Sequence, residues 1–286
     1  MPPRPAGDAD DDTSTASLML PRRPWRPLVT LTAGVGAALF VAAFVAAMLL
    51  GPQWGSLPVF AVFGAAMLLL AGGWVLLLGL PSPRGTTAAL AGAGVILLCG
   101  GVLSQELQES LLPAAVALSM IVEFVHQLAR RDGRPRLVES VSASITGITV
   151  LTSGACVLLL AAHEQGVASS VAIFGAVAVA SLADLGLRWG AGGPAAGLVA
   201  VALGALAAPV LGSVVGAQAS GVVLLVAGAV AAGSSYALRQ VQSVLPTLFG
   251  RRAQLASGVA SVLAPGVLAY AVTWLTLGPD MMAAVR

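Results

Sequence analysis

The sequence contains few charged residues and no lysine. Only 9% of its 286 residues are Asp, Glu, Lys or Arg, whereas soluble domains carry about 25%. Hydrophobic residues make up 58% of the chain, and a soluble domain of this length cannot hide that much apolar surface, because its exterior still needs polar groups. Lipid imposes no such requirement on a membrane protein. The composition therefore excludes an ordinary soluble domain and predicts an integral membrane protein.

The absence of lysine, the small net charge and the low cysteine content restrict the possible source and partners of the protein. All 14 basic residues are Arg, which indicates GC-rich coding and a bacterial source. A net charge of +2 is too small to indicate a nucleic-acid partner. The two cysteines, Cys99 and Cys156, lie inside apolar runs and are typical of small core residues rather than of a disulfide framework or a metal site.

The N-terminal segment, residues 1–27, is rich in Pro and Asp. It lacks the order of a signal peptide, in which a short basic region is followed directly by an apolar stretch. We expect a disordered cytoplasmic tail. The acidic run from Asp8 to Asp12 is either simply solvated or a contact for a basic partner.

Apolar segments long enough to cross a bilayer, which takes about 20 residues, fill the rest of the chain. We predict an all-α transmembrane bundle over residues 28–277, followed by a short tail, 278–286. Because several segments are separated by only a few residues, eight or ten spans remain compatible with the sequence. The nine predicted spans are 28–50, 57–80, 86–104, 111–129, 140–162, 167–187, 194–212, 219–238 and 253–277.

The distribution of arginine supports this count. Arginines accumulate in cytoplasmic loops. With nine spans and a cytoplasmic N-terminus, only Arg286 falls outside, and the outer loops carry acidic residues instead: Glu106, Glu109, Glu164 and Asp280. The predicted inner segments hold Arg4, Arg22, Arg23, Arg26, Arg84, Arg130, Arg131, Arg134, Arg136, Arg188, Arg239, Arg251 and Arg252. An error in the number of spans would place every later loop on the opposite side of the membrane and so spoil this distribution.

Two local patterns concern packing and the membrane surface. Small residues recur in the first span (Gly34, Ala38, Ala42 and Ala46) and the fifth (Ser140, Ser144, Gly147 and Gly154), which favours close helix packing. The segment 239–252 carries apolar residues at helical spacing between Arg239 and the pair Arg251 and Arg252. It predicts a short helix in the headgroup layer, broken at Pro246, with a plain loop as the alternative.

Three ionisable residues inside or near the spans are candidates for a buried polar site: Glu123, His126 and Asp184. Glu123 lies about 10 Å inward from Arg130 along a helix, where a charge is costly. Asp184 lies four residues before Arg188, so an i,i+4 ion pair explains it.

Glu123, His126 and Arg130 share one helix face. That face suits a proton relay or a substrate contact, or simply an ion pair of Glu123 with Arg130 or Arg131. Glu123 and His126 also form a Glu-x-x-His motif, which di-iron bundle proteins carry on each of two helices, together with a Glu from each of two others. The only other histidine, His163, lies in a predicted outer loop, so we expect no metal and no cofactor.

The loop after this helix concentrates arginine. Arg130, Arg131, Arg134 and Arg136 precede a hydroxyl-rich helix whose N-terminus favours an anion. Guanidinium groups bind phosphate bidentately. Two interpretations remain open: anchoring of the topology alone, or binding of an anionic lipid or phosphate, to which Arg239, Arg251 and Arg252 would also contribute.

No phosphate-binding loop, nucleophile elbow or His-Glu-x-x-His motif is present in the sequence. The stretch HQLARRDGRPRLVES and the general pattern of the chain resemble uncharacterised multi-pass membrane proteins of actinobacteria. That resemblance implies a bacterial cytoplasmic membrane and no particular activity.

We therefore weigh three hypotheses for the function. The first is a non-enzymatic accessory protein that binds a membrane partner. The second is a transporter or lipid translocase, for which Gly72-Gly73, Pro209 and Pro265-Gly266 would mark interrupted helices. The third is a lipid-modifying enzyme that uses Glu123, His126 and Asp184 at the cytoplasmic rim.

Overall fold

The computed structural model describes residues 25–51, 54–102, 105–130, 136–161, 163–190 and 193–278, and it describes the backbone alone for 101–102 and 105–112. Within these ranges all regular structure is helical. The predicted disordered tail therefore lies outside the described residues up to Pro24, and the C-terminal tail lies outside them after Gly278.

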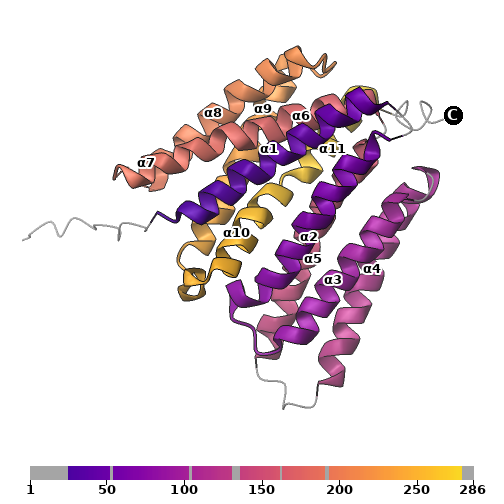
Figure 1. The fold of residues 1–286 in the computed structure, drawn as a ribbon, viewed down its shortest axis with the longest axis vertical. Coiled ribbons are helices and arrows are strands. Elements are labelled where there is room, and N and C mark those ends of the chain that lie inside the picture. Colours follow the sequence, from indigo (N-terminus) through magenta and orange to yellow (C-terminus); the bar gives the residue numbers. More distant parts are fainter. Residues whose placement is uncertain are drawn as a thin grey trace, which may run out of the picture.

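The helices follow one another with short connections (Figure 1). The first five are α1 (Pro27–Leu50), α2 (Ser56–Leu78), α3 (Pro83–Val102), α4 (Gln105–Ala129) and α5 (Leu137–Leu160). They are followed by α6 (Glu164–Ala180), the 3₁₀ turn η1 (Ser181–Ala183), α7 (Asp184–Arg188), α8 (Gly193–Val214) and α9 (Gly221–Gln242). The chain ends with the 3₁₀ turn η2 (Pro246–Phe249), α10 (Arg251–Leu263) and α11 (Gly266–Leu277).

Seven of these segments are long and apolar enough to cross a membrane: α1, α2, α5, α8, α9, the continuous run from α6 to α7, and the run from α10 to α11. Among the described residues, each of the nine predicted spans coincides with helix, although the last one is broken at Pro265. The remaining two are α3 and α4, which pack together as an antiparallel pair against α5 (Figure 1). The chain is thus a helical bundle with the length and polarity of a membrane protein.

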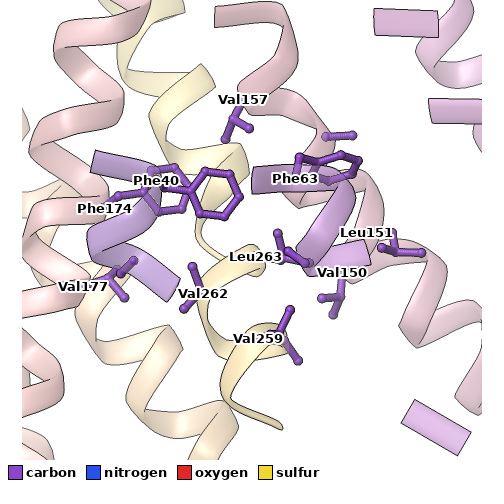
Figure 2. Packing of buried hydrophobic residues seen from close by; sticks show 14 of the residues in the cluster. Phe40, Phe63, Val150, Leu151, Val157, Phe174, Val177, Val259, Val262 and Leu263 are labelled. Carbon is purple, nitrogen blue, oxygen red and sulfur yellow. The ribbon is translucent and has the colours of Figure 1, made fainter. Parts of the chain in front are cut away.

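The centre of the bundle is α10, although it begins with two arginines and carries several serines. It packs against α1, α2, α5 and α9. Figure 2 shows Val259, Val262 and Leu263 of α10 between Phe40 on one side and Phe63 on the other. The ring of Phe40 stacks on that of Phe174 in α6, with 4.8 Å between centroids. A helix surrounded by other helices needs no lipid-facing surface, which explains how α10 tolerates Ser257 and Ser261.

Side-chain contacts tie together the helix ends that bear arginine. Arg26 lies 4.3 Å from the ring centroid of Phe249 in η2, and Arg188 lies 5.6 Å from that of Trp25. Arg136 donates a hydrogen bond of 3.0 Å to the carbonyl of Gly79 at the end of α2. These ends therefore lie on one side of the bundle. At the other side, Gln165 at the start of α6 bonds with the turn between α8 and α9.

Of the three predicted helix interruptions, only the one at Pro265 is a break. Helix α2 continues through Gly72-Gly73, and α8 continues through Pro209. Between α10 and α11 the Ser153 hydroxyl donates to the Ala264 carbonyl at 2.6 Å and accepts from the Val267 amide at 3.1 Å. Because one side chain satisfies both backbone groups, the break is held in a fixed geometry.

The predicted small-residue stripes have different outcomes. In α5, the four residues Ser140, Ser144, Gly147 and Gly154 are all buried, as expected. In α1 the prediction holds only for Gly34, where a Cβ would meet the Ser181 hydroxyl at 2.8 Å. Ala38 and Ala42 are exposed, and the buried face instead carries Ala33, Ala37, Phe40, Phe44 and Ala47. Two phenylalanines from the neighbouring positions provide the packing there.

The segment after α9 forms the 3₁₀ turn η2 rather than a longer helix. Pro246 occupies its first turn, where its missing N–H costs nothing. Leu248 is buried, and the Leu248 carbonyl accepts a hydrogen bond of 3.0 Å from Gln254. Val241, Val244 and Phe249 are exposed, so one apolar face remains available to the headgroup layer.

Candidate functional site

A buried ion pair joins two helices at the arginine-bearing side of the bundle. Arg239 of α9 donates to both carboxylate oxygens of Asp184, with Nε–Oδ2 at 3.0 Å and Nη2–Oδ1 at 3.2 Å. Both residues are only 3% exposed. Such bidentate pairs combine strength with a fixed orientation.

Further hydrogen bonds hold both members of this pair. Thr30 of α1 donates to Asp184 Oδ2 at 3.0 Å. Arg239 Nη1 donates to the hydroxyl of Ser235 at 2.7 Å and to that of Ser261 in α10 at 3.3 Å. Four segments, namely α1, α7, α9 and α10, thus share one polar network. A buried pair needs such additional bonds to offset its desolvation.

This network corrects two predictions. Asp184 pairs with Arg239 and not with Arg188, whose guanidinium lies instead over the Trp25 ring. Arg239 was expected to contact lipid phosphate, but its side chain is buried and bonded within the chain. The sequence held a signal for this: Gly228, Ala231, Ser235 and Arg239 follow helical spacing along one face of α9, and all four are buried.

A small cavity of about 30 Å³ adjoins the ion pair, lined by Trp25, Arg26, Thr30, Asp184 and Arg239 among others. Trp25 Nε1 and Arg26 Nε are buried and have no hydrogen-bond acceptor among the described residues. The volume suffices for about one water molecule. This hollow can hydrate the ion pair but is too small for an organic substrate.

A second polar group lies between α3, α4 and α5. Glu123 is 1% exposed, and its Oε1 accepts a hydrogen bond of 2.6 Å from Gln127 Nε2. Gln127 Oε1 in turn accepts from Arg130 Nη1 at 2.9 Å. The predicted link between Glu123 and Arg130 therefore runs through Gln127, a residue that the sequence analysis did not single out.

Several buried atoms of α3, α4 and α5 have no hydrogen-bond partner among the described residues: Thr86 Oγ1, Glu123 Oε2, His126 Nε2 and Ser140 Oγ. The His126 ring lies against the backbone of Gly85 in α3, so closely that a Cβ there would meet the ring at 1.9 Å. Glycine at position 85 is thus required to seat the imidazole. The group has acceptor and donor capacity left over for a small polar ligand or water.

The two polar groups do not form one site. Helix α4 contacts α3 and α5, whereas α7 contacts α8 and η1. Figure 1 shows α4 and α7 at opposite edges of the bundle. Glu123 and His126 are therefore held apart from Asp184, and the three residues cannot act together on one substrate.

The other candidate arginines differ in their surroundings. Arg130 is 9% exposed and bonds to Gln127, while Arg136 pairs with Glu139 and with the end of α2. Arg251 and Arg252 open α10 and are exposed, so their contact with lipid phosphate stays a prediction. Arg131 and Arg134 lie outside the described residues.

Metal ligation finds no support in the part of the chain that the structure describes, where no three His, Cys, Asp or Glu side chains gather. Comparison of the chain with protein-family models, with curated proteins and with solved structures gives no match. The functional argument therefore rests on the geometry of this chain.

Proposed function

We propose that this chain is a nine-span protein of a bacterial cytoplasmic membrane that acts without catalysis, as an accessory component that binds a membrane partner. The N-terminus is cytoplasmic in this proposal, and α3 and α4 cross the membrane as a hairpin in addition to the seven longer segments. Gathering of the arginine-bearing helix ends on one side of the bundle supports the orientation.

The separation of the buried ionisable residues carries the proposal. Asp184 accepts hydrogen bonds from Arg239 on both carboxylate oxygens and from Thr30 on one of them, so its contacts are those of a structural counter-charge rather than of an acid or base for a substrate. Helix α4, which carries Glu123 and His126, lies at the opposite edge of the bundle from α7 (Figure 1). An enzyme built on these three residues would need them in one cleft, whereas a structural role needs only the contacts that they make.

The test compares the chain in its native membrane with the chain alone. Gentle detergent extraction and native mass spectrometry should yield a complex of fixed stoichiometry with one other membrane protein. The complex should survive Glu123→Gln, since Glu123 is buried, and His126→Ala, since the accessory role does not use the imidazole. If the purified chain alone converts a lipid substrate, and Glu123→Gln abolishes that conversion, the accessory role is wrong.

The break between α10 and α11 favours one other candidate, a lipid translocase. Interrupted helices line the central sites of many transporters, and here the break lies beside the half-buried Ser153 of α5. In this case Pro265→Ala should let α10 continue into α11 and slow the movement of fluorescent lipid across reconstituted vesicles. Pro209→Ala is the matched control, because α8 is continuous through that proline.

A further inference from the structure

An apolar groove runs between α1, α2 and α10. Its volume is about 480 Å³, within the range of about 300–1,000 Å³ that is typical of ligand pockets. The lining is almost wholly aliphatic. Its one side-chain hydroxyl, that of Thr32, donates to the Leu28 carbonyl at 2.6 Å and so offers no donor to a ligand. The groove therefore suits a hydrocarbon chain and not a polar solute.

The groove has the length of one membrane leaflet. Along α1 it extends from Leu28 to Phe40, which is about 18 Å at the rise of an α-helix. One leaflet of hydrocarbon is about 15 Å thick. Since the groove begins at the arginine-bearing end of α1 and reaches Phe40 of α1 and Ala61 of α2, it matches one acyl chain that enters from that side.

Positive charge lies at the open end. A second hollow of about 250 Å³ shares Leu69 and Leu255 with the groove and is lined by Gly72, Gly73 and Arg252. Arg252 forms no ion pair with a described residue, and neither does Arg251 before it. Both arginines lie in the first turn of α10, which has no acidic residue and no side-chain cap. The helix dipole adds to their charge, so an anion here relieves an uncompensated positive potential.

We propose that this groove binds one anionic glycerophospholipid, with an acyl chain between α1, α2 and α10 and its phosphate at Arg252. Every lipid-facing surface contacts lipid transiently, but here shape and charge select one molecule of one headgroup class. The site is independent of the accessory role. It rests on the proposed orientation only for its assignment to the cytoplasmic leaflet.

Native mass spectrometry with two synthetic lipids tests the site. The purified chain is mixed with equal amounts of phosphatidylglycerol and phosphatidylcholine that carry identical acyl chains. We expect one phosphatidylglycerol to remain bound at collision energies that remove all other lipid. Arg252→Gln should lower the preference for phosphatidylglycerol about tenfold, as expected for the loss of a charge-assisted contact. Arg84→Gln, also an exposed arginine in a first helical turn, should leave it unchanged.

Filling the groove provides a second and independent variant. Ala61 and Ala65 of α2 line it and are exposed, so Ala61→Phe with Ala65→Phe should occupy the chain site while preserving the fold. Retention of phosphatidylglycerol should be lost. Ala202→Phe on the exposed face of α8 is the control for added bulk.

Three outcomes would overturn the proposal. The first is equal retention of lipid by the filled variant and the wild type at unchanged unfolding temperature. The second is a headgroup preference that Arg252→Gln does not alter. The third is a second protein chain, rather than lipid, displaced by the filled groove. Failure of the partner-complex test above affects none of these readouts.

Discussion

At the scale of single residues, the costly groups of this protein are its buried charges. A charge in the bilayer centre costs about 3 kcal/mol or more on insertion scales. Asp184 and Arg239 lie nearer the arginine-bearing end of the bundle and offset the cost of burial by pairing bidentately and by bonding to three hydroxyl groups, those of Thr30 in α1, Ser261 in α10 and Ser235 in α9 itself. Breaking such a pair is more harmful than never having formed it, because the remaining charge stays buried and unpaired.

Asp184→Asn should therefore destabilise the protein by about 3–5 kcal/mol, because Arg239 loses its counter-charge at 3% exposure. Thermal unfolding in detergent micelles measures the effect. Glu139→Gln removes the exposed pair with Arg136 and should cost only about 0–1 kcal/mol. The double variant with Arg239→Gln should recover part of the loss. An unfolding temperature of Asp184→Asn equal to that of the wild type would contradict this account.

Gln127 allows a second test at this scale. It gives Glu123 the one hydrogen bond that the described residues provide. Gln127→Ala should therefore cost about 1–3 kcal/mol, the penalty of a buried group left unsatisfied. When Glu123→Gln has already removed the buried charge, adding Gln127→Ala should cost less. Equal effects of Gln127→Ala in both backgrounds, measured by thermal unfolding, would show that the hydrogen bond does not matter.

At the scale of helices, apolar length was easier to predict than rotation about the helix axis. Every predicted span is helical, because hydrophobic length alone identifies such segments. The face of each helix that is buried was harder to predict, because lipid and protein core are equally apolar. In α1 the exposed face carries leucine and the buried face alanine and phenylalanine, so hydrophobicity cannot distinguish them. Small residues predicted the buried face of α5, where Gly147 admits the side chains of Trp74 and Leu90.

The predicted polar site likewise depends on helix packing that the sequence does not reveal. The depth of Glu123 along its helix predicted its burial, whereas Asp184 was placed near a helix end beside Arg188 and is nevertheless buried. Their partners were not predicted, because the sequence favours near neighbours such as Arg188, whereas the helix packing brings Arg239 from 55 residues away. No local pattern shows that Asp184 of α7 and Arg239 of α9 come into contact. The hydrogen bonds that connect Glu123 to Arg130 through Gln127 depend on side-chain rotamers, which residue spacing does not determine.

Contact between α8 and α9 depends on two glycines. A Cβ at Gly228 would lie 2.4 Å from the Gly204 carbonyl oxygen. Gly228→Ala should therefore force the helices apart and cost about 1–3 kcal/mol. The matched variant Gly92→Ala, where a Cβ meets nothing within 4 Å, should instead raise stability slightly, because alanine favours a helix. Thermal unfolding should thus move in opposite directions for the two variants, and a shared direction would be inconsistent with the packing.

At the scale of the whole molecule, the unsettled feature is the hairpin of α3 and α4. Seven segments meet the length and hydropathy of a span without it. Because a hairpin returns the chain to the side from which it left, all other loops keep their sides whether or not it crosses. The expectation that any error in the count would invert the later loops therefore fails for an error of two spans. The alternation of arginine tests the seven longer segments, and only the connection between α3 and α4 distinguishes nine spans from seven.

Cysteine labelling at that connection settles the count. In a background with Cys99 and Cys156 replaced by Ala, Glu106→Cys should react with a membrane-impermeant maleimide added to intact cells, because nine spans place it outside. Trp54→Cys, which lies after α1 and is exposed, should be labelled in either case. Ser82→Cys, between α2 and α3, should react only after the membrane is permeabilised. If Glu106→Cys behaves like Ser82→Cys, α3 and α4 remain on the cytoplasmic side and the protein has seven spans. Labelling of Ser82→Cys in intact cells would instead invert the whole bundle, and the lipid groove would then open to the outer leaflet.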